Sequence, residues 1–226
     1  MNQQSTVNAR FVYENALKIC AEFNINVQNA ILTMSDLVLE QQLSTTLTNY
    51  TFPVLSNDNG PSGTRFNTEQ RLNQQDVFIA SSWGVFLAEP TAVNDATFIV
   101  HTYPNPVAFA NAGESAALEI IYNSYCKIAV NNTVILPYWS LSRHRYVPQT
   151  QKTTAAANVN GNAYDQIDMS QDGFHPVEPN ILFVGSKGYQ IQVILPEGLA
   201  EIGAAGFTRL RIHYRGVLAQ NATIIT

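Results

Sequence analysis

Apolar residues are spaced differently in the two parts of the chain. Near the N-terminus they recur with the 3.6-residue period of an amphipathic helix, at Val12, Ala16, Ile19, Cys20 and Phe23. The next apolar stretch, residues 34–43, is less regular. Ser35 or Asp36 suits a helix N-cap there, but the spacing also fits a strand. We therefore expect an N-terminal arm or helical segment over residues 1–45.

From residue 76 onward, short runs rich in β-branched and aromatic residues replace the helical pattern. Pro, Gly and Asn clusters separate these runs, as expected of strands joined by turns. The runs are DVFIASSWGVFLA, TFIVHTY, LEIIYNSYCKIAV, TVILPYW, NILFVGS, YQIQVILP and TRLRIHYRGVLA. A series of short strands without intervening helices is typical of a sandwich. The pattern predicts an all-β domain over residues 46–226, a β-sandwich of the jelly-roll type.

Local turn and helix signals interrupt the β-rich part. Asn131 and Asn132 join two apolar runs, and asparagine accepts the positive φ that a two-residue type I′ hairpin turn requires. The Ser-Lys-Gly sequence at residues 186–188 predicts a second hairpin. The segment FANAGESAALEI indicates a short helix with Glu114 in its first turn.

Charged side chains are scarce in this chain. They make up 13% of the residues, about half of the usual share of roughly 25%, whereas Asn occurs 22 times and Gln 15 times. A surface of neutral amides repels other molecules weakly and suits a subunit that contacts its neighbours. A compositional bias toward asparagine codons is the alternative explanation. The net charge of −5 argues against a nucleic-acid coat that works through bulk charge.

The sequence contains no signal for a membrane or for secretion. No apolar stretch reaches 18 residues, which predicts that no helix spans a membrane. The N-terminus lacks a basic start followed by an apolar core, so we expect no signal peptide and a reducing, cytoplasm-like compartment. Cys20 and Cys126 lie far apart without metal-ligand spacing, and we expect both to be small buried apolar residues.

The last apolar run carries a row of cationic residues. They occupy every second position and therefore share one face of a strand: Arg209, Arg211, His213 and Arg215. The apolar residues between them face the opposite way: Leu210, Ile212 and Tyr214. Either this row is a solvated outer face that covers carboxylates of adjacent strands, or it docks on an acidic partner. A protein partner is favoured over nucleic acid, because no aromatic residue shares the face to stack on bases.

A second candidate interface follows the predicted hairpin, in the segment PYWSLSRHRYVPQTQ. It combines aromatic residues with arginines, as protein interfaces do, and we assign Trp139, Arg143 and Arg145 to a partner interface.

Catalytic chemistry has weaker support. None of the four histidines lies in a nucleophile motif, so we assign no catalytic residue and no cofactor. Five possible metal ligands are close together: Asp165, Asp168, Asp172, His175 and Glu178. Their spacing matches no known metal motif, and a polar connecting loop explains the segment better. A metal-dependent enzyme built on residues 165–178 stays an alternative, as does a carbohydrate- or receptor-binding module.

Several segments together resemble a known class of proteins. They are NQQDVFIASSWGVFLA, HTYPNPVAFA, ALEIIYNSYCKIAVNNTVILPYWSLSRHRYVPQTQ, DGFHPVEPNILFVGSKGYQIQVILPEG and IHYRGVLAQNA. In pattern they are similar to virion structural proteins of phages that infect Bacteroidota-type bacteria. The resemblance implies a jelly-roll body and a non-enzymatic, capsid-associated subunit, made in the host cytoplasm and incorporated into the virion. It implies as partners copies of the chain, in a homo-oligomer, and other virion proteins. Nucleic acid is the less favoured contact.

Overall fold

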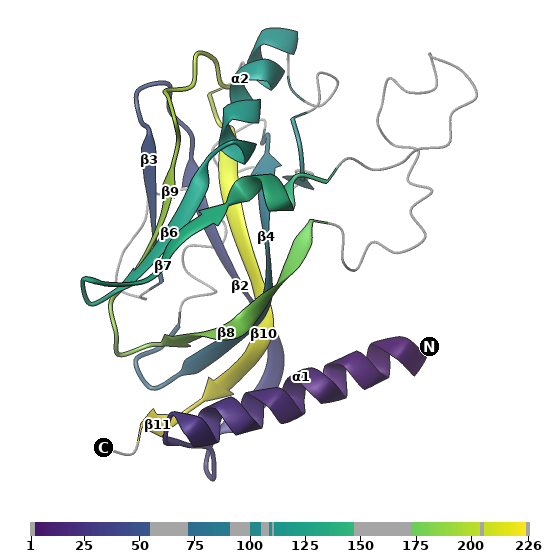
Figure 1. Ribbon diagram of the computed structural model, residues 1–226, viewed down its shortest axis with the longest axis vertical. Coiled ribbons are helices and arrows are strands. Elements are labelled where there is room, and N and C mark those ends of the chain that lie inside the picture. Colours follow the sequence, from purple (N-terminus) through teal and green to yellow (C-terminus); the bar gives the residue numbers. More distant parts are fainter. Residues whose placement is uncertain are drawn as a thin grey trace.

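The computed structural model describes residues 3–54, 72–90, 100–104, 109, 111–146, 173–203 and 206–224. Within these residues the chain forms two antiparallel sheets that pack against each other. Helix α1 (Gln3–Glu22) lies below the sheets and helix α2 (Ala112–Tyr122) lies at the opposite end (Figure 1). The prediction of an all-β sandwich with an N-terminal helical segment is confirmed.

The larger sheet has five strands and the smaller sheet has four. In the larger sheet β2 (Ile31–Gln42) pairs with β10 (Arg209–Gln220), β10 with β4 (Val77–Ala88), and β4 with both β5 (Val100–His101) and β8 (Phe174–Val184). The order in the smaller sheet is β3 (Asn49–Pro53), β9 (Tyr189–Ile194), β6 (Tyr125–Val130) and β7 (Thr133–Ser140). A further pair, β1 (Ile25–Asn26) with β11 (Thr223–Ile224), lies next to α1.

Most connections pass from one sheet to the other. Within the described strands, only β4–β5 and β6–β7 are consecutive neighbours in one sheet. The β6–β7 turn is the predicted hairpin, with φ of 45° at Asn131 and 70° at Asn132. The hairpin predicted at residues 186–188 is wrong. A turn is present there, but β8 and β9 belong to different sheets, so the turn carries the chain across the sandwich.

The main core fills the space between the two sheets. It contains large side chains from both, including Trp83 and Tyr214 from the larger sheet and Phe52 and Ile191 from the smaller one, each with at most 1% of its surface exposed. The rings of Trp83 and Tyr214 stack with centroids 5.3 Å apart. Burial of this apolar surface is the main term that holds the sheets together.

A second, smaller core lies on the other face of the larger sheet. Ala16 and Cys20 of α1 pack there on apolar residues of β4, β8 and β10, among them Val77, Val184 and Val217. A bulge in β4 between Ala80 and Ser82 changes which residues face α1. Beyond that bulge the same outer face carries the cationic row of β10 beside the rings of Phe86 and Phe174. Helix α1 covers the part of the outer face before the bulge.

In the segment at residues 34–43, residues 34–42 belong to strand β2. Its residues alternate between the main core, which contains Leu37 and Leu39, and the outer face, where Glu40 lies. Pairing with β10 along all twelve residues of β2 decides this conformation. The larger sheet thus begins inside the segment predicted as an arm. The predicted helix at FANAGESAALEI is present as α2, which also includes the first residues of the run LEIIYNSYCKIAV that we expected to be a strand.

Candidate docking surfaces

The cationic row lies on the outer face of the larger sheet, as the alternation in the sequence predicts. The apolar residues of β10 between the cations are fully buried in the main core: Leu210, Ile212 and Tyr214. The cations face outward above the part of the sheet that α1 covers. They do not all reach the surface, since Arg209 is only 3% exposed.

Glu40 on β2 binds two members of the row. Its side chain is fully buried and lies opposite Arg211 in the strand register. The Nε of Arg211 donates to Glu40 Oε1 at 2.6 Å, and Arg209 Nη1 lies 3.5 Å from Glu40 Oε2. The two arginines expose 4% and 12% of their side chains, so the three groups form a largely buried ionic network. A carboxylate can be buried there because two guanidiniums face it.

The other two members of the row also have contacts within the chain. His213 Nε2 lies 3.3 Å from Asp36 Oδ1 on β2. The nearby His213 side chain lowers the pKa of Asp36, and the charge of Arg215 acts in the same direction against the effect of burial. The guanidinium of Arg215 lies 3.6 Å from the centroid of the Phe174 ring, a cation–π contact.

An aromatic cluster supports this part of the outer face. Phe174 contacts both Phe86 and His213, with centroid distances of 5.3 and 5.1 Å. Gly84 makes room for these rings, because a Cβ at that position would lie 2.6 Å from the Phe86 ring. The row thus covers carboxylates of the adjacent strand β2, as the first of the two explanations expects, but Arg209 and Arg211 are largely buried rather than solvated. Docking of an acidic partner on it stays a prediction.

Trp139, Arg143 and Arg145 lie together around the short helix η1 (Leu141–His144), which follows β7. Trp139 Nε1 donates to His144 Nε2 at 2.9 Å. Because His144 Nε2 accepts, the ring proton lies on Nδ1, which donates to the Gly173 carbonyl at 3.3 Å. Burial lowers the pKa of His144 to about 3, against the opposing effect of the Gly173 carbonyl. His144 is therefore a neutral core residue.

The two arginines lie at the surface around this histidine. The guanidinium of Arg143 lies 4.8 Å from the centroid of the Trp139 ring. Arg145 forms an ion pair with Glu119 of α2 at 3.6 Å, and about half of each side chain is exposed. Arginine over tryptophan at a surface is a combination that interface hot spots favour. A role in partner binding stays a prediction for all three residues.

Strand β7 carries an exposed surface that the residue assignments from the sequence omitted. Val134, Ile135 and Tyr138 are 43%, 48% and 63% exposed, and we call these three residues the apolar strip. The Tyr138 ring stacks on Tyr125 of β6 at 4.9 Å. The signal in the sequence was the run TVILPYW, in which apolar residues do not alternate with polar ones. A strand in the middle of a sheet buries such a run, but among the described strands β7 pairs with β6 alone.

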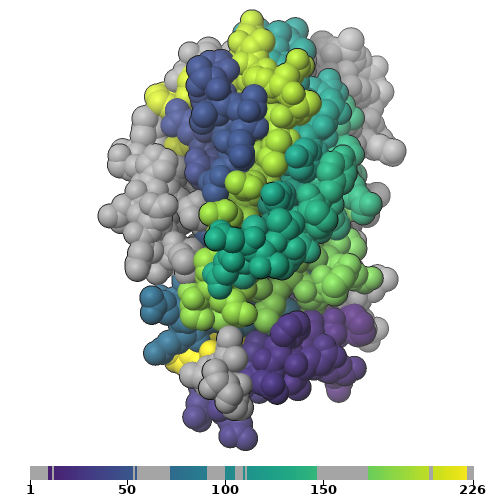
Figure 2. All heavy atoms as spheres, turned by 60° about the vertical axis from the view of Figure 1, so that its left-hand side comes forward, coloured from purple at the N-terminus to yellow at the C-terminus, as the bar shows by residue number. Residues whose placement is uncertain are grey.

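Other exposed apolar side chains lie on α1, just after it and at the beginning of β2. Phe11, Phe23, Ile31 and Met34 are 68%, 57%, 57% and 54% exposed. Figure 2 shows β6 and β7 in teal and α1 in purple on one side of the molecule, with residues in green between them. The apolar strip and α1 are therefore separate parts of this surface.

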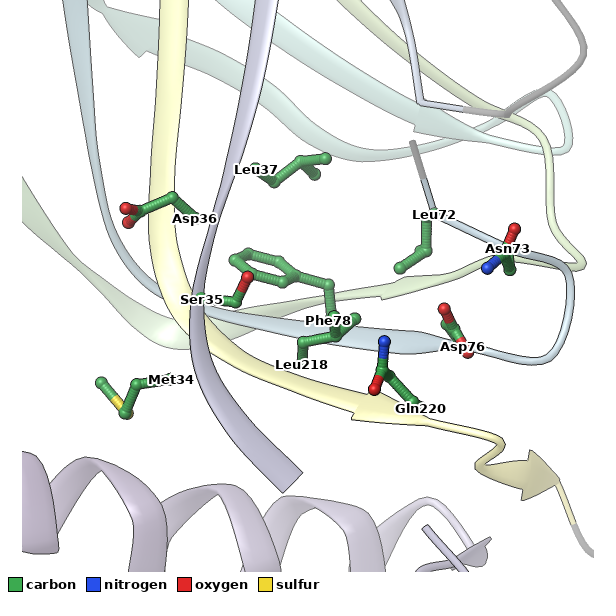
Figure 3. Close-up of a pocket in the computed structure, with 10 residues that line it drawn as sticks. All are labelled: Met34, Ser35, Asp36, Leu37, Leu72, Asn73, Asp76, Phe78, Leu218 and Gln220. Carbon is green, nitrogen blue, oxygen red and sulfur yellow. The ribbon is translucent and has the colours of Figure 1, made fainter. Parts of the chain in front are cut away.

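A cavity of about 550 Å³ lies where β2, β4 and β10 meet residues 72–76 (Figure 3). Its polar lining includes Ser35, Asp76 and Gln220. Asp76 is only 6% exposed, and its Oδ1 accepts a hydrogen bond from the Asn221 backbone N–H at 3.1 Å. That carboxylate therefore serves to hold the end of β10. The volume is within the range of small-molecule sites, which is roughly 300–1,000 Å³.

The acidic segment proposed as a metal alternative is only partly described. Asp165, Asp168 and Asp172 lie outside the described residues. The His175 ring packs against His144 with centroids 5.1 Å apart, and Glu178 is exposed. Among the described residues, no three His, Cys, Asp or Glu side chains are grouped as metal ligands.

Two carboxyl groups approach each other at the end of the sandwich that carries α2. Burial, and then the charge of Glu114, raise the pKa of Glu89 to about 7. Gly203 lies between them, since a Cβ there would be 3.0 Å from an oxygen of each carboxyl group. Glu89 thus retains its proton near neutral pH more readily than an exposed glutamate does.

Known proteins give no assignment for these surfaces. In the part of the chain that the structure describes, no helix is both long and apolar enough to cross a membrane. Comparisons with protein families, with curated proteins and with solved structures found no significant match. The fold and the surface chemistry described above therefore carry the functional argument.

Proposed function

We propose that this chain is a non-enzymatic structural subunit of a phage particle, associated with the capsid, that works by binding copies of itself and other virion proteins. The virion assignment is supported by the resemblance in sequence. Assembly is supported by the surface of the folded chain.

The strand order supports a jelly roll as the body of the subunit. The longer strands form two sets of four, β2-β10-β4-β8 and β3-β9-β6-β7, and the chain crosses between the sheets at nearly every connection. A double sheet of eight strands with Greek-key connections is the jelly-roll architecture, which viral capsid domains share with lectins and cupins. The fold is therefore consistent with a capsid subunit but does not select it among these classes.

One observation carries the assembly part of the proposal: large apolar side chains are exposed close together on β7. The three residues of the apolar strip are each 43–63% exposed within a single strand. Exposed apolar residues in groups mark interaction surfaces, whereas single ones need no explanation. The chain has few charges to oppose close contact between copies, since only 13% of its residues are charged.

The charge distribution favours protein partners over nucleic acid. The net charge is −5, and the cationic row on β10 faces Glu40 and Asp36 of the same chain. Phosphate binding by bulk positive charge has little support on such a surface.

Sedimentation velocity of the purified chain over a wide range of protein and salt concentration tests the proposal, together with electron microscopy for rings or shells. We expect oligomers that persist as salt is raised, because contacts between apolar groups are not screened. A chain that stays monomeric at every concentration would refute self-association as its mechanism.

A carbohydrate-binding module is a second candidate, and one observation favours it. Tyr138, 63% exposed, stacks on Tyr125 at the outer face of the smaller sheet, and an exposed aromatic platform can bind the apolar face of a sugar ring. Glycan-array binding that disappears in Tyr138→Ala, by a chain that remains monomeric, would support this candidate and contradict the first.

A further inference from the structure

The cavity of about 550 Å³ lies between the inner face of the larger sheet and residues 72–76 (Figure 3). On the sheet, Phe78 of β4 lies opposite Leu218 of β10 in the strand register, and Ser35 of β2 lies opposite Gly216. Among the described strands β2 pairs with β10 alone, so the cavity lies toward one edge of this sheet. A space of this size holds a small organic molecule.

The lining combines an apolar floor with polar groups that a ligand can reach. Leu37, Leu72 and Phe78 form the floor, since each exposes at most 3% of its surface and belongs to the main core. Asn73 and Gln220 are exposed. A ligand in the cavity therefore meets groups that form hydrogen bonds rather than a wide apolar surface.

Asp76 is a nearly buried carboxylate in this lining, with 6% of its surface exposed. Its Oδ1 accepts a hydrogen bond from the Asn221 N–H at 3.1 Å. Its backbone is also fixed, because its N–H donates to the Asn73 carbonyl at 3.0 Å and its carbonyl accepts from the Gly185 N–H at 2.9 Å. The carboxylate is thus held in place before a ligand binds, which lowers the entropy that binding costs.

The other carboxylate of the lining, Asp36, is turned away from Asp76. Figure 3 shows Asp36 and Met34 on the other side of the β2 ribbon from Asp76 and Gln220. Asp36 Oδ1 lies 3.3 Å from His213 Nε2, so its charge is matched by the cationic row. Asp76 therefore supplies the negative charge at the end of the cavity near residues 72–76.

The lining offers Asp76 no positive charge. None of the ten lining residues is Lys, Arg or His, and the ion pairs formed among the described residues do not include Asp76. A carboxylate has about four positions that accept hydrogen bonds, so the bond from Asn221 leaves others for a ligand. Because a nearly buried carboxylate gains most from a cation that also donates hydrogen bonds, the site selects a cation with N–H groups.

A bare metal ion fits these groups less well than an organic cation does. Calcium takes six to eight oxygen ligands at roughly 2.3–2.6 Å. Among the described residues, no three His, Cys, Asp or Glu side chains are grouped as metal ligands. The volume of the cavity also leaves room for an organic body beside the charged group.

We propose that this cavity binds a small organic cation, whose ammonium or guanidinium group donates hydrogen bonds to Asp76 while the rest of the molecule lies between Gln220, Asn73 and the apolar floor. The inference goes beyond the proposed function and does not depend on it, because the apolar strip lies on β7, in the other sheet.

Three probes that share one alkyl chain test the site: n-butylguanidinium, n-butylammonium and n-butanol. Saturation-transfer difference NMR measures weak binding to the full chain, whatever its state of association. We expect both cations to bind with dissociation constants on the order of 1 mM, as suits ligands of about five to eight non-hydrogen atoms. The alcohol should bind at least tenfold more weakly, and equal binding of all three would overturn the inference.

Asp76→Asn is the deciding variant, because asparagine retains an oxygen for the Asn221 N–H and loses the charge. We expect it to raise the dissociation constants of both cations at least tenfold. Glu197→Gln is the matched control, since it removes the same charge at an exposed position outside the cavity, and it should change nothing. Unchanged binding by Asp76→Asn, or an equal loss in both variants, would overturn the site.

A second variant keeps the test decisive if Asp76→Asn does not fold. Gln220 is exposed and lies next to Asp76, so Gln220→Lys brings an ammonium group of the chain itself to that carboxylate (Figure 3). This lysine should displace the added cations and abolish their binding, while circular dichroism shows that the chain is folded. A folded Gln220→Lys chain that binds the cations as tightly as the unmodified chain would refute the proposal.

Discussion

Replacement of Glu40 by glutamine tests whether the cationic row is a structural part of the sheet. The change preserves the shape of the side chain and removes a charge that is fully buried between Arg209 and Arg211. The guanidiniums expose only 4% and 12% of their side chains, so water replaces little of the lost interaction.

The expected size follows from this burial. Breaking a buried ion pair by removing one partner costs about 3–5 kcal/mol, because a charge remains without compensation. Both arginines have further interactions within the chain. We therefore expect the low end of that range, a loss of about 3 kcal/mol in the free energy of unfolding. Such a loss is a large part of the roughly 5–15 kcal/mol that a domain has.

Equilibrium unfolding in urea measures this change, with the midpoint and the slope fitted separately. The matched control is Asp36→Asn, on the same strand, where the carboxylate near His213 is 51% exposed; it should cost less than about 1 kcal/mol. In about 1 M salt the Asp36 effect should disappear and the Glu40 effect should remain. A loss below about 1 kcal/mol in Glu40→Gln, at an unchanged slope, would refute the buried network.

Three further predictions concern stability. The pKa of His144 is about 3 in the folded chain and about 6.5 when unfolded, so the unfolded state binds the proton first as the pH falls. The free energy of unfolding should therefore fall by up to about 1.4 kcal/mol per pH unit as the pH drops from 6.5 to 3. His144→Gln should remove this slope, as measured by urea unfolding at successive pH values. Glu89 acts with the opposite sign, because its folded pKa of about 7 lies above the usual 4.5. The free energy of unfolding should therefore fall as the pH rises from 4.5 to 7, with a slope reduced by solvent exposure. In Glu89→Gln this loss of stability over the same pH range should disappear. Gly216→Ala should lower the melting temperature strongly, since the new Cβ would lie 1.9 Å from the Ile79 carbonyl oxygen. Gly188→Ala is the control and should not, because its Cβ would lie 3.5 Å from its nearest neighbour, Asn131 Oδ1. Equal melting temperatures in the two variants would contradict the packing of β10 on β4.

Patterns within one segment were readable from the sequence. The period of 3.6 residues predicted α1, and the period of two predicted which side of β10 faces the core. Asn131 and Asn132 predicted the β6–β7 turn, because asparagine tolerates positive φ and both residues have it. Each of these features depends on the local backbone and on the side chains of that segment alone.

Features that depend on distant segments were not readable. The partner of the cationic row, Glu40, lies 171 residues before Arg211, and no local pattern relates the two. The same limit explains residues 34–43, where the spacing fitted a helix or a strand until pairing with β10 decided it. The omitted apolar strip is a related case, since a run of apolar residues is buried in a central strand and exposed at an edge.

The turn at residues 186–188 shows why the order of strands must come from the structure. Turn residues there signal a change of direction, and the sequence contains that signal equally for a hairpin and for a crossing between sheets. Gly185 shows the difference, because a Cβ at that position would lie 1.7 Å from the Asn73 carbonyl oxygen, so the backbone passes directly against another connection. Among the described strands β7 comes last in the smaller sheet, and the exposure of the apolar strip follows from that position rather than from the composition of β7.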